Sequence, residues 1–284
     1  MKNKNKNKED NFLSFLYSNL EKSFWKRFIL RICISKTLNK ASTLYLKSFV
    51  SKIHIKKIVK KNNIDLNLFE KNKFKSYNDF FIRKYKNISF VKDNDCFISP
   101  CEGKIMTFYI NDNSVFSIKG VNYHLSDLLK NSSLASEYNE GYLILLRLRP
   151  VDYHRYIFVD DGVQKKENIC RIKGKLHTVN PISFKYYNVF AENSREYCIL
   201  ETKNFGKIVQ VEIGALLVGK INNFPIQEFN KGQEKGFFSF GGSTIVLLLK
   251  KNKLIIEKEF LENSKKNIET DISLGQKIGI KKHI

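Results

Sequence analysis

Short apolar runs separated by glycine and asparagine turns dominate the chain from about Asp95 onward. Such runs are typical of β-strands. They do not alternate with long helical patterns, so the sequence does not indicate a parallel sheet built from βαβ units. We expect the last two runs to form a hairpin across Lys250–Lys253. The predicted strands are Ile105–Ile110, Tyr142–Leu148, Tyr156–Val159, Cys170–Lys175, Tyr197–Thr202, Lys207–Ile213, Ser243–Leu249 and Leu254–Phe260.

The N-terminal part of the chain follows a helical period instead. Apolar residues recur at helical spacing from Phe12 to Ile29, and again within Leu44–Lys61, with lysines and arginines between them. Both segments predict amphipathic helices. The predicted fold class is therefore α+β, with a helical, basic region over residues 1–90 and a β-rich domain over residues 91–284.

Positive charge is concentrated in that N-terminal region. The chain has 50 Lys+Arg against 28 Asp+Glu, a net charge of +22, and most of the excess lies before residue 91. Basic helices with aromatic apolar faces suit an anionic lipid surface. The alternative, that the apolar stripes pack on the rest of the protein while the lysines are solvated, stays open. No RNP, zinc-finger or helix-turn-helix pattern supports a nucleic-acid partner.

Neither a membrane-spanning segment nor a secretion signal is recognisable. No apolar run approaches the ~20 residues that a spanning helix needs, and the lysine-rich start is not followed by a signal-peptide pattern. We therefore expect an intracellular protein. The cysteines are odd in number and form no CxxC pair, so we expect neither a disulfide framework nor a metal site. They are Cys33, Cys96, Cys101, Cys170 and Cys198.

Three segments carry candidate chemistry. Ser99–Ile105 places Glu102 in a tight turn before a strand, and Arg149–Tyr156 places His154 just after one. Near the C-terminus, two glycines precede Ser243, which leads directly into an apolar strand. Each has an ordinary structural interpretation: a solvated turn glutamate, a structural histidine and a turn or bulge. The serine does not lie in a G-x-S-x-G motif, so a hydrolase nucleophile elbow is unsupported.

Taken in order, these segments resemble the pyruvoyl-dependent phosphatidylserine decarboxylases from roughly Ser76 onward. The Gly-Gly before the serine resembles the form found in a bacterial branch of that family. The matching segments are Tyr77–Lys84, Ser99–Lys104, Asp152–Arg155, Leu176–Pro181, Glu192–Glu196, Val211–Ala215, Val218–Gly219 and Lys231–Thr244.

This resemblance implies a proenzyme that cuts itself between Gly242 and Ser243 into a β chain, 1–242, and an α chain, 243–284. The Ser243 hydroxyl would attack the Gly242 carbonyl, and β-elimination with loss of ammonia would leave a covalent pyruvoyl group. The family's charge relay implies catalytic roles for Glu102, His154 and Ser243. Glu102 stands where the family usually has aspartate.

The same resemblance implies the reaction and its setting. The pyruvoyl group derived from Ser243 would form a Schiff base with phosphatidylserine in an anionic membrane, releasing CO₂ and leaving phosphatidylethanolamine. Neither a metal nor an external cofactor is needed. The expected location is the cytoplasmic side of the cell membrane, as a peripheral protein. The sequence does not fix the oligomeric state, and a homo-oligomer is compatible with it.

A second departure from the family concerns Ile157. It stands three residues after His154, where many relatives carry another histidine that has also been given a catalytic role. The alternative function is therefore a lipid-surface binding relative that keeps the fold without processing itself.

Overall fold

The computed structural model describes residues 15, 23–33, 35–118, 121–178, 188–215, 220–239 and 243–283. The predicted α+β class is confirmed, since these residues form helices and antiparallel sheets. The helices are α2 (Phe24–Cys33), α3 (Lys36–Lys47), α4 (Ile53–Asn62), α5 (Tyr77–Phe81), α6 (Leu125–Leu129), α7 (Ser132–Ser136), α8 (Val189–Glu192) and α9 (Lys258–Lys265), with 3₁₀ helices η2 (Phe49–Lys52), η3 (Leu66–Leu68) and η4 (Lys166–Asn168).

A large antiparallel sheet carries the core. Its order is β12-β7-β9-β10-β14-β5-β2-β16, and β8 also pairs with β9. Every residue of β14 is buried, and strands occupy both of its edges. The members are β2 (Gly103–Tyr109), β5 (Tyr142–Leu148), β7 (Gly162–Val163), β8 (Ile169–Ile172), β9 (Arg195–Thr202), β10 (Gly206–Ile213), β12 (Glu228–Phe229), β14 (Ser243–Leu249) and β16 (Thr270–Ile272).

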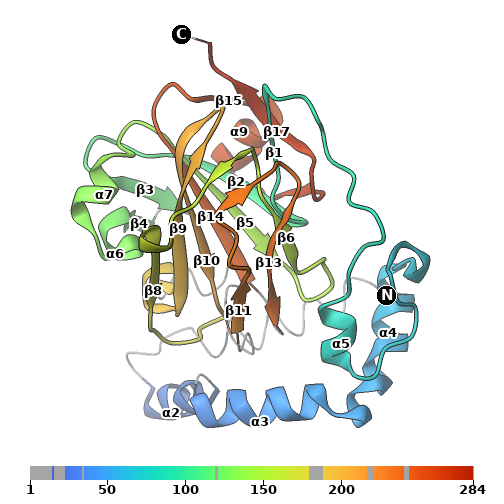
Figure 1. Ribbon diagram of the computed structural model, residues 1–284. Coiled ribbons are helices and arrows are strands. Elements are labelled where there is room, and N and C mark those ends of the chain that lie inside the picture. Colours follow the sequence, from blue (N-terminus) through green and yellow to red (C-terminus); the bar gives the residue numbers. More distant parts are fainter. Residues whose placement is uncertain are drawn as a thin grey trace.

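A smaller sheet covers part of one face of the large sheet (Figure 1). It consists of β11 (Lys220–Asn223), β13 (Glu234–Ser239) and β6 (Arg155–Ile157). The two sheets are joined by a buried ion pair in which Lys235 of β13 donates to Glu212 of β10 at 2.8 Å. Two further small sheets are β1-β17-β15 and β3-β4, formed by β1 (Cys96–Ile98), β3 (Val115–Ile118), β4 (Val121–His124), β15 (Leu254–Ile256) and β17 (Lys277–Lys281).

The predicted C-terminal hairpin is wrong. β15 pairs with β17, because both edges of β14 are already occupied by β10 and β5. The predicted strand Leu254–Phe260 also ends early, at Ile256, and α9 follows it. Phe260 and Ser264, four residues apart on one helix face, are buried, and the Ser264 hydroxyl accepts a hydrogen bond from the Thr107 amide of β2 at 2.9 Å.

Of the other predicted strands, Tyr142–Leu148 and Ser243–Leu249 are confirmed to the residue. Ile105–Ile110, Tyr197–Thr202 and Lys207–Ile213 are strands whose ends shift by one or two residues. Tyr156–Val159 and Cys170–Lys175 start one residue earlier than expected and end at Ile157 and Ile172.

The predicted continuous helix over Leu44–Lys61 is interrupted. α3 ends at Lys47, and η2 separates it from α4. Serine hydroxyls at the break bind backbone carbonyls, with Ser48 donating to Tyr45 at 2.5 Å and Ser51 to Leu46 at 3.0 Å. Such bonds compete with helix continuation. Of the earlier predicted helix, α2 is described, whereas Phe12, Leu13, Leu16 and Leu20 lie outside the described residues.

A second apolar cluster lies around α5. Its buried aromatic residues pack against apolar side chains of α3 and α4. This packing holds α3 and α4 beside α5, which precedes the β-rich part of the chain (Figure 1). The buried members are Phe74, Tyr77, Phe80 and Phe81.

Candidate active site

Two of the three predicted site segments meet at one rung of the large sheet, that is, at one row of residues paired across β14, β5 and β2. Ser243 of β14 pairs with Leu148 of β5. On the other edge of β5, a Cβ placed on Gly103 of β2 would lie 3.3 Å from the Leu148 Cα. Glu102 directly precedes this rung. The structure therefore places Glu102 and Ser243 at the same end of the sheet, one strand apart.

The Ser243 side chain projects into the layer between the two sheets, and His154 directly precedes β6 of the small sheet. Ser243 lies on the same face as Ile245, which pairs with Glu212, and Glu212 binds Lys235 of the small sheet. Phe238 of β13 donates a backbone hydrogen bond to the His154 carbonyl at 3.0 Å, which extends the pairing of β6 with β13 by one residue. Both Ser243 and His154 are fully buried.

The hydrogen bond at His154 Nδ1 fixes which ring nitrogen carries the proton. Nδ1 lies 2.9 Å from the Asp152 carbonyl oxygen. Because a carbonyl oxygen can only accept, the neutral ring carries its hydrogen on Nδ1 and its lone pair on Nε2. The Phe81 ring packs on the imidazole, with 3.8 Å between the ring centroids. His154 is therefore oriented as a proton acceptor through Nε2.

Glu102 lies in a different setting from the other two residues. Its carboxylate accepts a hydrogen bond from the Tyr85 hydroxyl at 3.1 Å. Burial raises the pKa of Glu102, the nearby Asp152 charge raises it further, and the Tyr85 bond and the Arg83 charge oppose the rise. Glu102 also lies on the wall of a cavity of about 390 Å³. The cavity is lined by Asn67, Leu68, Tyr85, Lys86, Asn87, Ile88, Ser89, Glu102, Ser273 and Leu274.

The Ser243 hydroxyl is buried and makes no hydrogen bond within the part of the chain that the structure describes. The same holds for the neighbouring Thr244 hydroxyl. An unmet buried polar group costs about 1–3 kcal/mol. A serine nucleophile needs its oxygen lone pairs free for attack while its hydroxyl donates to a base. No donor among the described residues engages the lone pairs of Ser243 Oγ. Phe240, Gly241 and Gly242, and with them the predicted cleavage bond, lie outside the described residues.

Two residues near the site were missed by sequence reasoning, although both lie in segments that it singled out. The Asn193 side chain donates to the carbonyls of His177 and Gly214, at 2.9 and 2.8 Å, beside the strand end that faces Ser243. Arg83 donates to the carbonyls of Val151 and Asp152. Because these partners are backbone groups, no sequence pattern reveals them.

Within the described residues, no group of three or more His, Cys, Asp or Glu side chains is arranged to hold a metal ion.

Comparison with known proteins gives the same family as the sequence motifs. A family model described as phosphatidylserine decarboxylase matches residues 77–280. Phosphatidylserine decarboxylase proenzyme 2 of Clostridium acetobutylicum is 43% identical, covering 94% of this chain and 91% of its own length. Proenzymes of Clostridium botulinum and Clostridium novyi are 41% and 39% identical, covering 89% and 96% of this chain and 88% and 93% of their own lengths.

Matches of this extent show that the chain belongs to the class of decarboxylases. Within that class, the chain belongs to the phosphatidylserine decarboxylase family, and the resemblance found in its motifs is confirmed.

Proposed function

We propose that this chain is a self-processing decarboxylase that converts phosphatidylserine to phosphatidylethanolamine and CO₂. The observation that carries the proposal is the buried Ser243 hydroxyl, which makes no hydrogen bond among the described residues. It lies on the face of the large sheet that the small sheet covers, and His154 extends that small sheet by one residue. The relatives named above are called phosphatidylserine decarboxylase proenzymes, which supports both the substrate and a processed form.

The proposed self-cleavage uses His154 as the base. Its Nε2 takes the proton from Ser243 Oγ, which attacks the carbonyl carbon of Gly242. An ester C–O bond forms as the peptide C–N bond breaks, and the proton taken from the hydroxyl passes to the Ser243 nitrogen. β-Elimination then removes the Ser243 Cα hydrogen as a proton and breaks the ester Cβ–O bond, so that Gly242 leaves as a carboxylate and residue 243 becomes dehydroalanine. Its enamine rearranges to an imine, which water hydrolyses to a carbonyl group with release of ammonia. The products are a chain of residues 1–242 and a chain of residues 243–284 that begins with a pyruvoyl group.

The pyruvoyl group would supply a carbonyl that takes up the electrons released when the substrate carboxylate leaves as CO₂. The residues of this chain have separate tasks around it. His154 delivers or removes a proton at Nε2, and the layer between the sheets keeps bulk water away from residue 243. Glu102, at the cavity wall, contributes a carboxyl group on the side from which a small ligand can approach.

We further propose that the N-terminal helices hold the protein on the cytoplasmic face of an anionic membrane. Large apolar side chains of α2 and η2 stay exposed, with Trp25 at 70% and Phe49 at 75%. Their exposure favours the lipid-binding interpretation of these side chains over packing on the core. Lysines of the same region supply the charge for anionic headgroups. Among the described residues, no helix is long and apolar enough to cross a membrane.

Intact mass spectrometry of the purified protein tests the proposed processing. We expect two chains from the wild type, with the smaller one starting at a pyruvoyl group, and one uncut chain from Ser243→Ala. Ser239→Ala, which removes a hydroxyl four residues away, is the matched control and should be cut like the wild type. A single wild-type chain of 33.3 kDa after incubation with anionic vesicles would contradict the proposal.

A second assay separates chemistry from cleavage. Vesicles that contain phosphatidylserine labelled in the carboxylate should release labelled CO₂ only with the cleaved protein. Cleavage without release of CO₂ would refute the proposed reaction while leaving the proposed self-processing intact.

A further inference from the structure

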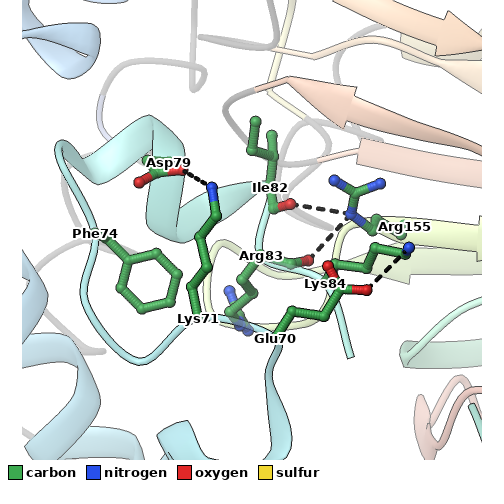
Figure 2. A pocket seen from close by; sticks show the side chains of 8 residues that line it. All are labelled: Glu70, Lys71, Phe74, Asp79, Ile82, Arg83, Lys84 and Arg155. Atoms are coloured by element: carbon green, nitrogen blue, oxygen red, sulfur yellow. Dashed lines mark hydrogen bonds and ion pairs between the residues drawn. The ribbon is translucent and has the colours of Figure 1, made fainter. Parts of the chain in front are cut away.

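Two segments far apart in the sequence hold each other through reciprocal arginine contacts. Arg83 Nη2 donates to the carbonyls of Val151 and Asp152, at 2.8 and 3.1 Å. In return, Arg155 Nε donates to the carbonyls of Ile82 and Arg83, at 3.0 and 3.2 Å. Figure 2 shows the Arg155 side of this arrangement. The segment that carries His154 is therefore fixed on both sides of the histidine.

Arg83 occupies a costly position. It is almost completely buried, and its guanidinium lies over the rings of Phe69 and Phe80, at 5.1 and 4.7 Å from their centroids. Burial lowers the pKa of Arg83, and the charges of Glu102 and Asp152 oppose that change. Buried ionic groups are weak evidence for a role in stability alone, because burial removes the hydration of the charge. The contacts of Arg83 therefore point to a further role.

The Asp152 carbonyl oxygen links Arg83 to the candidate base. It lies 3.1 Å from Arg83 Nη2 and 2.9 Å from His154 Nδ1. A carbonyl oxygen has two lone pairs, so it accepts both bonds at once. With Arg83 in place, this oxygen is held where the imidazole can donate to it.

We propose that Arg83 is a positioning residue for His154, fixing the Asp152 carbonyl so that the imidazole keeps its hydrogen on Nδ1 and directs Nε2 toward Ser243. This inference rests on the proposed function, in which His154 Nε2 takes the serine proton. It goes further by assigning a role to an arginine that touches neither the serine nor the histidine ring.

Two other described contacts near His154 do not perform this task. The Phe81 ring restrains the plane of the imidazole, but it packs equally well on either tautomer. The Asp152 side chain is engaged with Arg149, whose Nη2 lies 2.7 Å from Asp152 Oδ1. That ion pair restrains the carboxylate. Of these described contacts, the Arg83 contact is the one that acts on the carbonyl oxygen itself.

The first experiment compares the rate of self-cleavage in freshly expressed precursors. Arg83→Gln should slow cleavage by about 10- to 100-fold, since small errors of position in a proton acceptor cost this much. Arg83→Lys should be intermediate, because it keeps the charge but cannot reach two carbonyls with a planar fork. The control is Lys84→Gln, the adjacent cation, which pairs with Glu70 at the surface and should leave the rate unchanged.

The second experiment observes the tautomer directly, in uncut Ser243→Ala precursor labelled with ¹⁵N in its histidines. The His154 ring, assigned by loss of its signals in His154→Gln, should show protonated Nδ1 and unprotonated Nε2. Adding Arg83→Gln, or Arg83→Lys if the glutamine variant does not fold, should give a mixture of tautomers. An unchanged Nδ1–H tautomer in a folded Arg83 variant would overturn the inference.

The two experiments separate this inference from the proposed function. If the wild type is never cut, the proposed function fails, yet the ¹⁵N spectrum still decides what Arg83 does. If the wild type is cut and Arg83→Gln is cut as fast, the positioning role fails while the function stands.

Discussion

Glu102 combines a half-buried position with a raised pKa, and this has consequences for stability. Because the folded chain holds the Glu102 proton more tightly than the unfolded chain, its contribution to stability is present below the ordinary glutamate pKa and is lost as pH rises through the raised value. Glu102→Gln removes the ionisable group but keeps an acceptor for Tyr85. We expect this variant to melt at a higher temperature than the wild type near neutral pH, and the difference to shrink toward acid pH. Thermal unfolding of Ser243→Ala precursors across pH measures this, and a difference independent of pH would contradict it.

His154 is the residue whose loss should affect processing most strongly after Ser243. His154→Gln removes the proton acceptor, and general base catalysis of this kind contributes about 10²- to 10⁴-fold. We expect cleavage to slow by that factor, as followed by mass spectrometry over time. His283→Gln, at an exposed histidine near the C-terminus, is the control and should be cut like the wild type.

The residues of the candidate site were predicted from the family resemblance, because their local patterns alone also have ordinary structural interpretations. Ser243 follows two glycines and begins an apolar run, and His154 follows a strand. The positions of Arg83 and Asn193 against backbone carbonyls depend on which loops the fold brings together. The partial burial of Glu102 near Asp152 was not predictable either, because a glutamate in a turn is expected to be solvated.

At the scale of single elements, the close approach of β2 to β5 supports the site. A Cβ on Gly103 would lie 2.5 Å from the Arg147 carbonyl oxygen, so Gly103→Ala must push the two strands apart next to Glu102. We expect this variant to unfold at a lower temperature and to cleave itself more slowly. A variant that is cut at the wild-type rate would show that the rung between Glu102 and Ser243 tolerates displacement.

The ion pair between β13 and β10 gives a second prediction at this scale. Lys235 and Glu212 are both fully buried, and burial raises the pKa of Glu212 while the Lys235 charge opposes the rise. Lys235→Met should lower the free energy of unfolding by about 3–5 kcal/mol, because a buried carboxylate loses its cation. Adding Glu212→Gln should recover part of that loss. Urea unfolding of the uncut precursors tests both, and additive losses would contradict the pairing.

Strands of the large sheet were predictable because their apolar runs are continuous and end at clear breakers. β5 and β14 are the best examples. β11 and β13 were missed, since polar residues such as Asn223 and Lys235 take inward positions and find their partners on other strands. The false hairpin has a related cause: sequence patterns show neighbours along the chain but not which strand edges are already occupied.

At the scale of the molecule, most of the exposed large apolar side chains among the described residues lie in the N-terminal region. Trp25 is the single tryptophan of the chain, so its fluorescence reports on α2 alone. We expect a blue shift when anionic vesicles are added, weakened by salt and absent with neutral vesicles. Phe49→Ser combined with Ile53→Ser should weaken vesicle binding without changing the melting temperature. Unchanged fluorescence and binding would contradict membrane attachment through these helices.

The division at residue 90 into a membrane-associating region and a catalytic domain stays a proposal. The described contacts show that the two are closely connected, since α5 packs against α3 and α4 on one side while Phe81 packs on His154 on the other. A cut at residue 90 would remove Phe81, Arg83 and Tyr85 from the site. The candidate catalytic machinery therefore draws on both regions.

The central place of β14 affects how long the protein can persist after it matures. If the chain is cut before Ser243, β14 becomes the first strand of a separate polypeptide, and both of its edges stay hydrogen-bonded to β10 and β5 of the other polypeptide. Folding of the precursor is a unimolecular process, but reassembly of the two pieces requires an encounter whose rate depends on concentration. The mature form would then be maintained by a high barrier to opening, and each molecule that opens at cellular dilution would be lost.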